Sequence, residues 1–324
     1  MKFCALACVA FFAGASLSAA VWPKHRKDVA VFHGRVALAD GSLPQLLVMV
    51  ERVCNGVAKE SGYVDSEGRF TVEFGPEDDP SHCLFRARLP GYRSSTLTPA
   101  DANDGNLGTL VLRWRGAKDD TSARSARNKL MTKPGWPLYE TGLDLASKGK
   151  FNDAEYSLEQ STKVFPWASS NFFALGILRQ REGDAMGAEK SYASALAAED
   201  SWVLPLIYSC QLEASRQEWQ QALEHAKKVI AADPKAFPAA WFVSAWASLN
   251  LHDLGAAETS AQEGLALDTE HEFPELDYVL ALALTDKGDK MGAAEHLKAY
   301  LELDPKGRRA QAARDQLSQL TAAK

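Results

Sequence analysis

The chain has 324 residues, of which 46% are hydrophobic and 24% are charged, a composition typical of soluble proteins with room for two domains. Its formal net charge of −6 argues against a general nucleic-acid binder, because contacts to phosphate need clustered Lys and Arg. No apolar run reaches the roughly 20 residues that a membrane-spanning helix requires.

The first twenty residues have the layout of a secretory signal peptide. Lys2 gives a positive start, residues 3–14 are apolar, and Ser18 and Ala20 stand at positions −3 and −1 of a cut after Ala20. An uncleaved anchor is disfavoured because the apolar core is short, and a lipoprotein modified at Cys8 because few residues precede it. We therefore expect an exported protein, periplasmic or secreted, with no transmembrane helix in the mature chain.

Residues 29–114 are predicted to form an all-β domain. Short runs that alternate apolar and polar residues are separated by turns rich in Gly, Asn, Asp and Pro, which is typical of a sandwich or barrel. The expected strands lie at 29–36, 46–53, 69–74, 83–89 and 107–114.

Several motifs of this domain are similar to those of carboxypeptidase regulatory-like domains. They are Gly34-Arg35-Val36, the Asp-x-x-Gly-Arg-Phe element at 65–70, Pro90-Gly91-Tyr92 and the apolar run at 107–112. The family consists of small prealbumin-like β-sandwiches that are common in exported bacterial proteins. The resemblance implies an accessory domain and no peptidase activity.

Removal of the signal peptide leaves three cysteines, Cys54, Cys83 and Cys210. An oxidising compartment permits one disulfide. Cys54 and Cys83 both lie at ends of expected strands in the β domain, so we expect them to pair. The alternative is that they are two separate buried thiols.

Residues 115–134 are predicted to link the β domain to the rest of the chain. Basic residues far outnumber acidic ones between 113 and 134, and residues 122–130 are expected to form a short helix. Such a basic strip docks on an acidic partner or a lipid surface in some proteins, but a solvated linker is the preferred interpretation.

The segment 135–305 repeats itself with a period of about 34 residues. One column of the repeat holds only alanine, spaced 34, 34, 35 and 36 residues apart: Ala154, Ala188, Ala222, Ala257 and Ala293. A turn column holds Gly149, Gly183 and Gly288, with Gln217 and His252 replacing glycine in the third and fourth units. Proline twelve residues after the alanine column marks helix ends, because it cannot continue a helix.

This pattern resembles a tetratricopeptide repeat (TPR) array of five units, each made of two helices. Residues 306–322 are expected to form a capping helix with Ala312, Leu317 and Leu320 on its apolar face. The expected fold class is therefore multidomain, an all-β sandwich followed by an all-α TPR superhelix. Cys210 falls in a column of small residues, so a buried and inert thiol is expected there.

The resemblance also implies a concave groove lined by the first helix of each repeat. Carried over to this sequence, the groove positions are Tyr139, Leu143, Phe173, Ile177, Gln180, Ile207, Gln211, Phe242, Trp246 and Tyr278. Large apolar residues in register would bury an extended or helical peptide. The alternative is that these side chains pack into neighbouring repeats or against the β domain.

The sequence carries no motif typical of catalysis, cofactor binding or metal binding. The seven histidines form no His-Glu-x-x-His, and the chain has no Cys-x-x-Cys, no Gly-x-Ser-x-Gly and no phosphate-binding Gly-rich loop. We therefore expect neither cofactor nor metal, and a protein that is not an enzyme.

The preferred hypothesis is an exported scaffold or adaptor that binds proteins or peptides in the groove of its array, with envelope association and no nucleic-acid partner. One alternative is a carbohydrate- or cell-surface-binding module, with the sandwich as receptor and the array as spacer. Another is a hydrolase with its site between the two domains.

Overall fold

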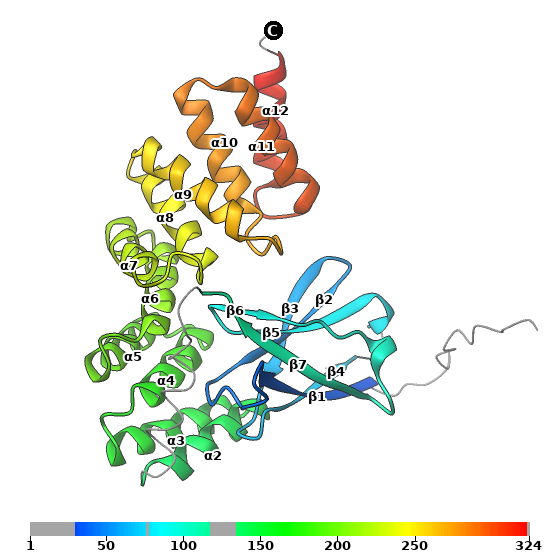
Figure 1. Cartoon of the computed structure of the whole chain (residues 1–324), viewed down its shortest axis with the longest axis vertical. Helices are drawn as coiled ribbons and strands as arrows, with labels where there is room; N and C mark the ends of the chain where they lie inside the picture. Colours follow the sequence, from blue (N-terminus) through cyan, green and yellow to red (C-terminus); the bar gives the residue numbers. More distant parts are fainter. Residues whose placement is uncertain (1–29, 76–77, 117–133, 323–324) are drawn as a thin grey trace, which may run out of the picture.

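The computed structural model describes residues 30–75, 78–116 and 134–322. They form an N-terminal β domain and a helical array that curves around it (Figure 1). The expected signal peptide and the expected helix at 122–130 lie outside the described residues. The predicted fold class, a β sandwich followed by a TPR superhelix, is confirmed.

The β domain consists of two sheets packed face to face. One has four strands in the order β4-β1-β7-β6 and the other three in the order β3-β2-β5. Strand β1 runs parallel to β7, and the other paired strands are antiparallel. The strands are β1 (Ala30–Leu38), β2 (Met49–Cys54), β3 (Val57–Tyr63), β4 (Arg69–Phe74), β5 (Cys83–Arg88), β6 (Tyr92–Ser94) and β7 (Asn106–Trp114).

Alternation along the strands places the aromatic residues between the sheets. In β4, Phe70, Val72 and Phe74 are buried while the residues between them are exposed. The rings of Phe32 in β1 and Phe85 in β5 lie 5.7 Å apart, which joins the two sheets through an aromatic contact.

Two strands, β3 and β6, were missed by the sequence analysis. The first four residues of β3 are exposed, so this edge strand carries no apolar alternation and is held by backbone pairing with β2. It follows a tight turn in which Asn55 and Gly56 have φ of 51° and 79°. Strand β6 is only three residues long and also lies at an edge.

The predicted pairing of Cys54 with Cys83 is confirmed. The two residues are direct partners in the ladder between β2 and β5, with Cα atoms 4.1 Å apart. The bond closes a loop with a sequence separation of 29 residues.

Removing this disulfide should destabilise the protein. For Cys54→Ser/Cys83→Ser we expect the free energy of unfolding to fall by about 3–4 kcal/mol, because the cross-link restricts the unfolded chain. Urea unfolding measures the loss. Dithiothreitol should lower the stability of the wild type toward that of the double variant and leave the variant unchanged. If the wild type and the variant were equally stable without reductant, the expectation would be contradicted.

The array contains eleven helices within the described residues, arranged as five pairs and a final single helix. The first helices of the pairs are α2 (Trp136–Ser147), α4 (Ser169–Arg181), α6 (Val203–Ser215), α8 (Pro238–Asn250) and α10 (Glu275–Lys287). The second helices are α3 (Phe151–Val164), α5 (Ala185–Ala198), α7 (Trp219–Ala232), α9 (Leu254–Leu267) and α11 (Lys290–Leu303), followed by α12 (Ala310–Ala322).

The turn between the two helices of every repeat has the same backbone conformation. The five residues of the turn column have positive φ, whether or not they are glycine: Gly149 70°, Gly183 84°, Gln217 63°, His252 62° and Gly288 88°. In the second, fourth and fifth repeats the next residue is an aspartate that caps the following helix; Asp253, for example, accepts a hydrogen bond from the Ala256 N–H at 3.0 Å. The third and fourth repeats, which have Gln217 and His252 in place of glycine, therefore keep the same turn at a cost in backbone strain.

Relieving that strain should stabilise the array. His252 is exposed, so His252→Gly should raise the free energy of unfolding by about 1 kcal/mol, because glycine adopts the left-handed region without a Cβ clash. The matched control is Gly183→Ala, where an added Cβ has open space around it and strain alone should cost about 1 kcal/mol. Urea titration checks both signs, and a destabilised His252→Gly would refute the account.

Small residues let the paired helices approach closely, as the repeat columns predict. All five alanines of the alanine column are fully buried, and a Cβ added to Gly176 would lie 2.2 Å from the Tyr192 ring. Cys210 is fully buried, and burial raises the pKa of its thiol well above the ordinary value, so the predicted inert thiol is supported. In α12 the expected apolar face is wrong at Ala312, which is exposed; Ala313 is buried instead, beside the half-buried Leu317 and Leu320.

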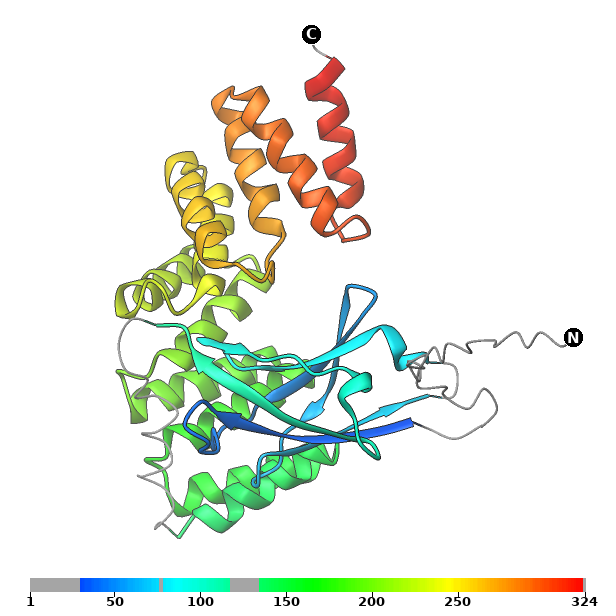
Figure 2. The same ribbon diagram turned by 45° about the vertical axis from the view of Figure 1, so that its right-hand side comes forward.

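The β domain lies on the inner side of the curved array, beside the first helices of the early repeats (Figures 1 and 2). One continuous core of buried residues includes Phe32 and Phe85 of the sandwich together with Tyr139, Phe173 and Ile207 of the array. The Tyr139 hydroxyl donates a hydrogen bond to the Gln45 carbonyl at 3.0 Å, and the Asp144 carboxylate accepts one from the Ser66 N–H at 2.9 Å. The two domains are therefore packed as one unit.

Further along the array, the end of β7 and the turn between β5 and β6 contact Phe237, the residue before α8. Trp114 of β7 and Phe237 stack edge to face with ring centroids 5.6 Å apart. Gly91 has φ of 84°, and a Cβ there would lie 2.4 Å from Trp114 and 2.7 Å from Phe237. The Pro-Gly-Tyr element thus needs glycine at this position both for its backbone conformation and for the contact with the array.

A group of ion pairs, which we call the clasp, fastens the array between its fourth and fifth repeats. It joins Arg88 and Arg93 of the β domain and Arg115, the residue after β7, to Glu270 and Glu272 of the α9–α10 loop. Arg115 contacts Glu270 and Glu272, both at 3.1 Å, with only 7% of its side chain exposed. Arg88 pairs with Glu272 at 3.2 Å and Arg93 with Glu270 at 2.6 Å. Arg115 belongs to the predicted basic linker but is not solvated.

Weakening the clasp should destabilise the protein measurably. Glu272→Gln leaves Arg115 with less compensation in a buried place, so we expect a loss of about 3 kcal/mol in the free energy of unfolding. The control Glu263→Gln removes the same charge from an exposed position of α9 and should change stability by less than about 0.5 kcal/mol. Equal effects of the two substitutions in urea unfolding would show that the clasp contributes nothing.

Candidate functional site: an open groove at the distal end of the array

The predicted stripe of groove residues divides into a covered part and an open part. Tyr139, Leu143, Phe173, Ile177, Ile207 and Tyr278 are all buried in the protein. Tyr139 lies under the β domain, to which it is hydrogen-bonded. For these positions the structure agrees with the alternative of packing against neighbouring repeats or the β domain.

The covered part is a tightly packed aromatic cluster. Phe173 is fully buried, and its ring contacts Trp202 at 4.9 Å and Tyr208 at 5.1 Å between centroids. Burial raises the pKa of Tyr208 to about 12, against the lowering effect of Arg88 from the β domain, so the phenol is neutral at physiological pH. The Gln180 carbonyl oxygen accepts a hydrogen bond from the Tyr192 hydroxyl at 2.7 Å, which occupies this side chain within the array.

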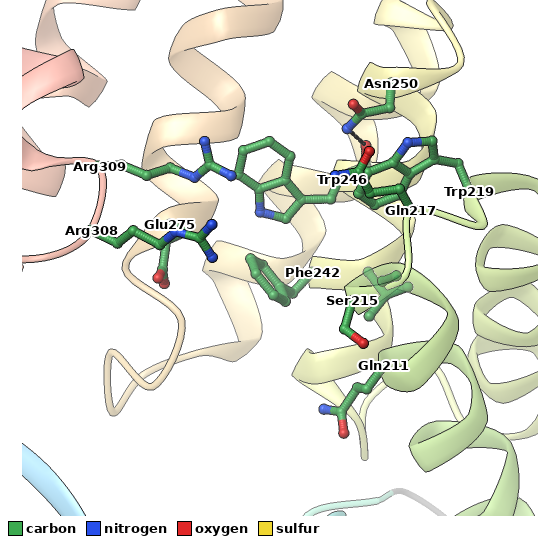
Figure 3. A pocket seen from close by; sticks show the side chains of 12 residues that line it. Gln211, Ser215, Gln217, Trp219, Phe242, Trp246, Asn250, Glu275, Arg308 and Arg309 are labelled. Atoms are coloured by element: carbon green, nitrogen blue, oxygen red, sulfur yellow. Dashed lines mark hydrogen bonds between the residues drawn. The ribbon is translucent and has the colours of Figure 1, made fainter. Parts of the chain in front are cut away.

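Three predicted groove residues, Gln211, Phe242 and Trp246, meet in an open hollow of about 540 Å³ that we call the distal groove. It lies between α6, α8 and the segment that precedes α12 (Figure 3). Ser215 and Gln217 line the end near α6, and Trp219 and Asn250 line the edge beside α8 (Figure 3). The surface combines aromatic rings with amide and hydroxyl groups.

The aromatic rings of the distal groove are held by packing behind them. Phe242 stacks on Phe273 with centroids 5.3 Å apart, and Trp246 packs on Tyr278 at 6.2 Å. Both Phe242 and Trp246 remain partly exposed. Their positions are therefore fixed before any ligand arrives, as in a preorganised binding surface.

Two arginines form the opposite wall. Arg308 and Arg309 come from the turn between α11 and α12, and Glu275 at the start of α10 lies on the same side (Figure 3). The guanidinium of Arg309 lies over the Trp246 ring at 4.2 Å and near the Tyr278 ring at 5.5 Å. This wall gives the distal groove a positive rim.

Sequence reasoning missed Arg308 and Arg309 because it treated 306–322 only as a cap. In the structure α12 packs against both helices of the last repeat; Leu317 joins the cluster of Tyr278 and Tyr300, and Gln316 donates a hydrogen bond to the Thr285 hydroxyl at 3.2 Å. The capping helix thus stands where the first helix of a sixth repeat would stand. The sequence feature that could have indicated them is an arginine pair directly before a helix that takes the position of a groove-lining first helix.

A second hollow, of about 1120 Å³, lies over the outer face of the four-stranded sheet. Arg69 in it contacts both Asp65 and Glu67 at 2.8 Å, and Arg35, Glu73 and Lys148 also line it. Phe70 lines it but is 3% exposed, whereas the imidazole of His33 is exposed. The residues that line this face therefore offer polar groups and no open Phe, Tyr or Trp ring on which a sugar could stack.

Other kinds of site find no support in the described part of the chain. Within residues 30–75, 78–116 and 134–322, no group of three His, Cys, Asp or Glu side chains is arranged to hold a metal ion. Over the same ranges, no helix has the length and apolarity needed to span a membrane.

Comparison with known proteins supports the helical fold. No family model matches the chain, and no curated protein matches it. A tetratricopeptide repeat protein from Parabacteroides merdae is similar over 58% of this chain and 73% of its own, with 19% identity and a TM-score of 0.50.

Two further solved structures match less well. MamA from Desulfovibrio magneticus covers 54% of this chain and 97% of its own at 18% identity, with a TM-score of 0.48. The Cut9-Hcn1 hetero-tetramer of the APC/C covers 61% of this chain and 38% of its own at 19% identity, with a TM-score of 0.47. At these identities the likeness concerns the fold alone. Fold and site together define a TPR superhelix wrapped around a β-sandwich, with an open groove at its distal end.

Proposed function

We propose that this protein is an exported, non-enzymatic scaffold that binds a protein or peptide in the distal groove. The observation that carries the proposal is the partly exposed pair Phe242 and Trp246, held in place by packing and flanked by hydrogen-bonding side chains. Large aromatic residues in an open hollow are typical anchors of protein recognition. The covered residues of the stripe serve the fold in this proposal.

Export is part of the same proposal. It is supported by the Cys54–Cys83 disulfide, since such bonds persist in oxidising compartments. A relation of the β domain to carboxypeptidase regulatory-like domains is also proposed, and the two-sheet architecture supports it. The domain acts in this proposal as an accessory element that braces the array.

The alternative of carbohydrate or cell-surface binding through the sandwich has less support. In the hollow on the four-stranded sheet, Arg69 is engaged by Asp65 and Glu67, and the Phe70 ring is buried. A hydrolase site between the domains has less support as well, because a shared apolar core, an aromatic contact and ion pairs occupy much of the described interface. Where Ser147 and Lys148 at the end of α2 join the hollow on the four-stranded sheet, the Asp65 carboxylate is engaged by Arg69.

Removing the two anchors should abolish partner binding. We expect Phe242→Ala/Trp246→Ala to lose the bound protein in a pull-down from an envelope fraction analysed by mass spectrometry, at a loss of about 2 kcal/mol or more for each anchor. The matched control is Trp167→Ala, which removes a ring that is 76% exposed and lies outside the distal groove. It should retain the partner.

A second variant separates loss of binding from loss of structure. Ser215 is exposed and lines the distal groove, so Ser215→Tyr should fill the hollow without removing any packed ring. It should keep the helical circular dichroism of the wild type and lose the partner. Retention of the partner by both groove variants would contradict the proposal.

A further inference from the structure

We infer that the ligand of the distal groove is an acidic peptide segment whose carboxylates bind Arg308 and Arg309 and whose aromatic or aliphatic side chain packs on Phe242 and Trp246. This inference rests on the proposed function and names the chemistry of its partner. It is carried by the charge of the rim, the contact of Arg309 with Trp246 and the polar lining of the hollow.

The arginine pair differs from the other arginines that the structure describes around it. Arg216, near the other end of the groove, contacts Glu189 at 2.8 Å and Glu218 at 2.5 Å, and Arg115 contacts two glutamates in the clasp. Among the described residues, Arg308 and Arg309 form no ion pair with a carboxylate. Glu275 lines the same hollow without pairing with either of them.

The contact with Trp246 prepares Arg309 for a carboxylate. The guanidinium carbon lies over the Trp246 ring, 4.2 Å from its centroid, which restricts the positions that the group can take. A ring contact of this kind uses no N–H donor, so the guanidinium keeps the donors that bind a carboxylate in a bidentate manner. Arg308 beside it is exposed and supplies a second cation.

The charge of the groove is opposite to that of the whole chain. The hollow contains two arginines and one glutamate as its charged residues, whereas the formal net charge of the protein is −6. A local positive rim on an acidic protein attracts an anionic partner selectively and repels basic ones. The chain's own basic stretches at 24–27 and 124–133 carry the wrong charge to occupy it.

The remaining lining favours a peptide over other anions. Gln211 and Gln217 present amide groups that can donate to and accept from a peptide backbone. Asn250 donates its Nδ2 to the Trp246 carbonyl at 2.8 Å and adds its amide oxygen as an acceptor. In Figure 3 the ring of Phe242 lies between Gln211 and the arginines, and the ring of Trp246 lies between the arginines and the pair Gln217 and Asn250. A chain that crosses the groove would therefore meet an apolar anchor between its polar contacts. This order of polar, apolar and cationic surfaces fits a short acidic segment with one apolar side chain.

The test is selection from a displayed library of random peptides of about twelve residues on the full-length mature protein, followed by fluorescence anisotropy with synthetic peptides. We expect the enriched sequences to be net negative with an aromatic or aliphatic residue. Replacing their Asp and Glu by Asn and Gln should weaken binding at least about tenfold at low salt, because the charge-assisted contacts are lost.

Protein variants assign the effect to the arginines. Arg308→Gln/Arg309→Gln should weaken the acidic peptide by about tenfold or more and leave the amide-substituted peptide unaffected. The matched control Lys290→Gln/Lys298→Gln removes the same charge from exposed positions of α11 and should change neither. An equal loss of affinity in the lysine variant would overturn the assignment, since the effect would then come from the net charge of the protein and not from the two arginines.

The remaining outcomes distinguish this inference from the proposed function. Enrichment of neutral or basic peptides that requires Trp246 would overturn the acidic specificity and leave the groove as a peptide site. Tighter binding of a single-stranded oligonucleotide than of any acidic peptide would overturn it in favour of another anion. Absence of any peptide that depends on Trp246 would overturn both proposals.

Discussion

Burial of the β domain in the concave side of the array is the contact on which the rest of the structure depends. A single hydrophobic core runs from the sandwich into the first repeats, and the Tyr139–Gln45 hydrogen bond lies inside it. An aromatic-lined inner surface of a solenoid would otherwise face water along several repeats. Here the protein's own domain covers the early part of that surface, and among the described residues an open hollow lies between α6, α8 and the segment that precedes α12.

Because of this arrangement, the stripe of large apolar residues on the first helices has two roles, one part forming a core and the other lining an open hollow. Phe173 and Phe242 occupy equivalent positions in the second and fourth repeats, yet Phe173 is fully buried and Phe242 lines an open hollow. The difference does not come from the residues themselves but from what lies opposite them. The Phe173 ring is enclosed by Trp202 and Tyr208 in the core that the array shares with the sandwich, while Phe242 packs on Phe273 and keeps its other side toward the hollow.

The local parts of the fold could be predicted from the sequence, and the long-range parts could not. Column spacing located the helix pairs and their turns, because a repeat must place the same small residue at each close crossing. Cys54 and Cys83 were recognisable as partners from their place at strand ends. The edge strand β3 was hidden, since its pairing uses backbone groups and the side chains of its first four residues are exposed.

Two further features lay beyond sequence reasoning for the same physical reason. Arg115 seemed to belong to a solvated linker, but its partners Glu270 and Glu272 are more than 150 positions away along the chain. Of the candidate site, the residues on the first helices followed from the repeat, whereas the role of Arg308 and Arg309 depends on how α12 packs against α10. Neither the ion pairs of Arg115 nor the packing of α12 produces a periodic pattern in the sequence.

The clasp has a mechanical consequence. A solenoid of stacked helix pairs behaves as a spring, whose curvature changes through small rotations between neighbouring repeats. In this protein the sandwich is packed on the first repeats and tied by Arg88, Arg93 and Arg115 to the loop before α10, so the spring is fixed at two points. The width of the distal groove is then set during folding, and a ligand would bind without a change in the curvature of the array.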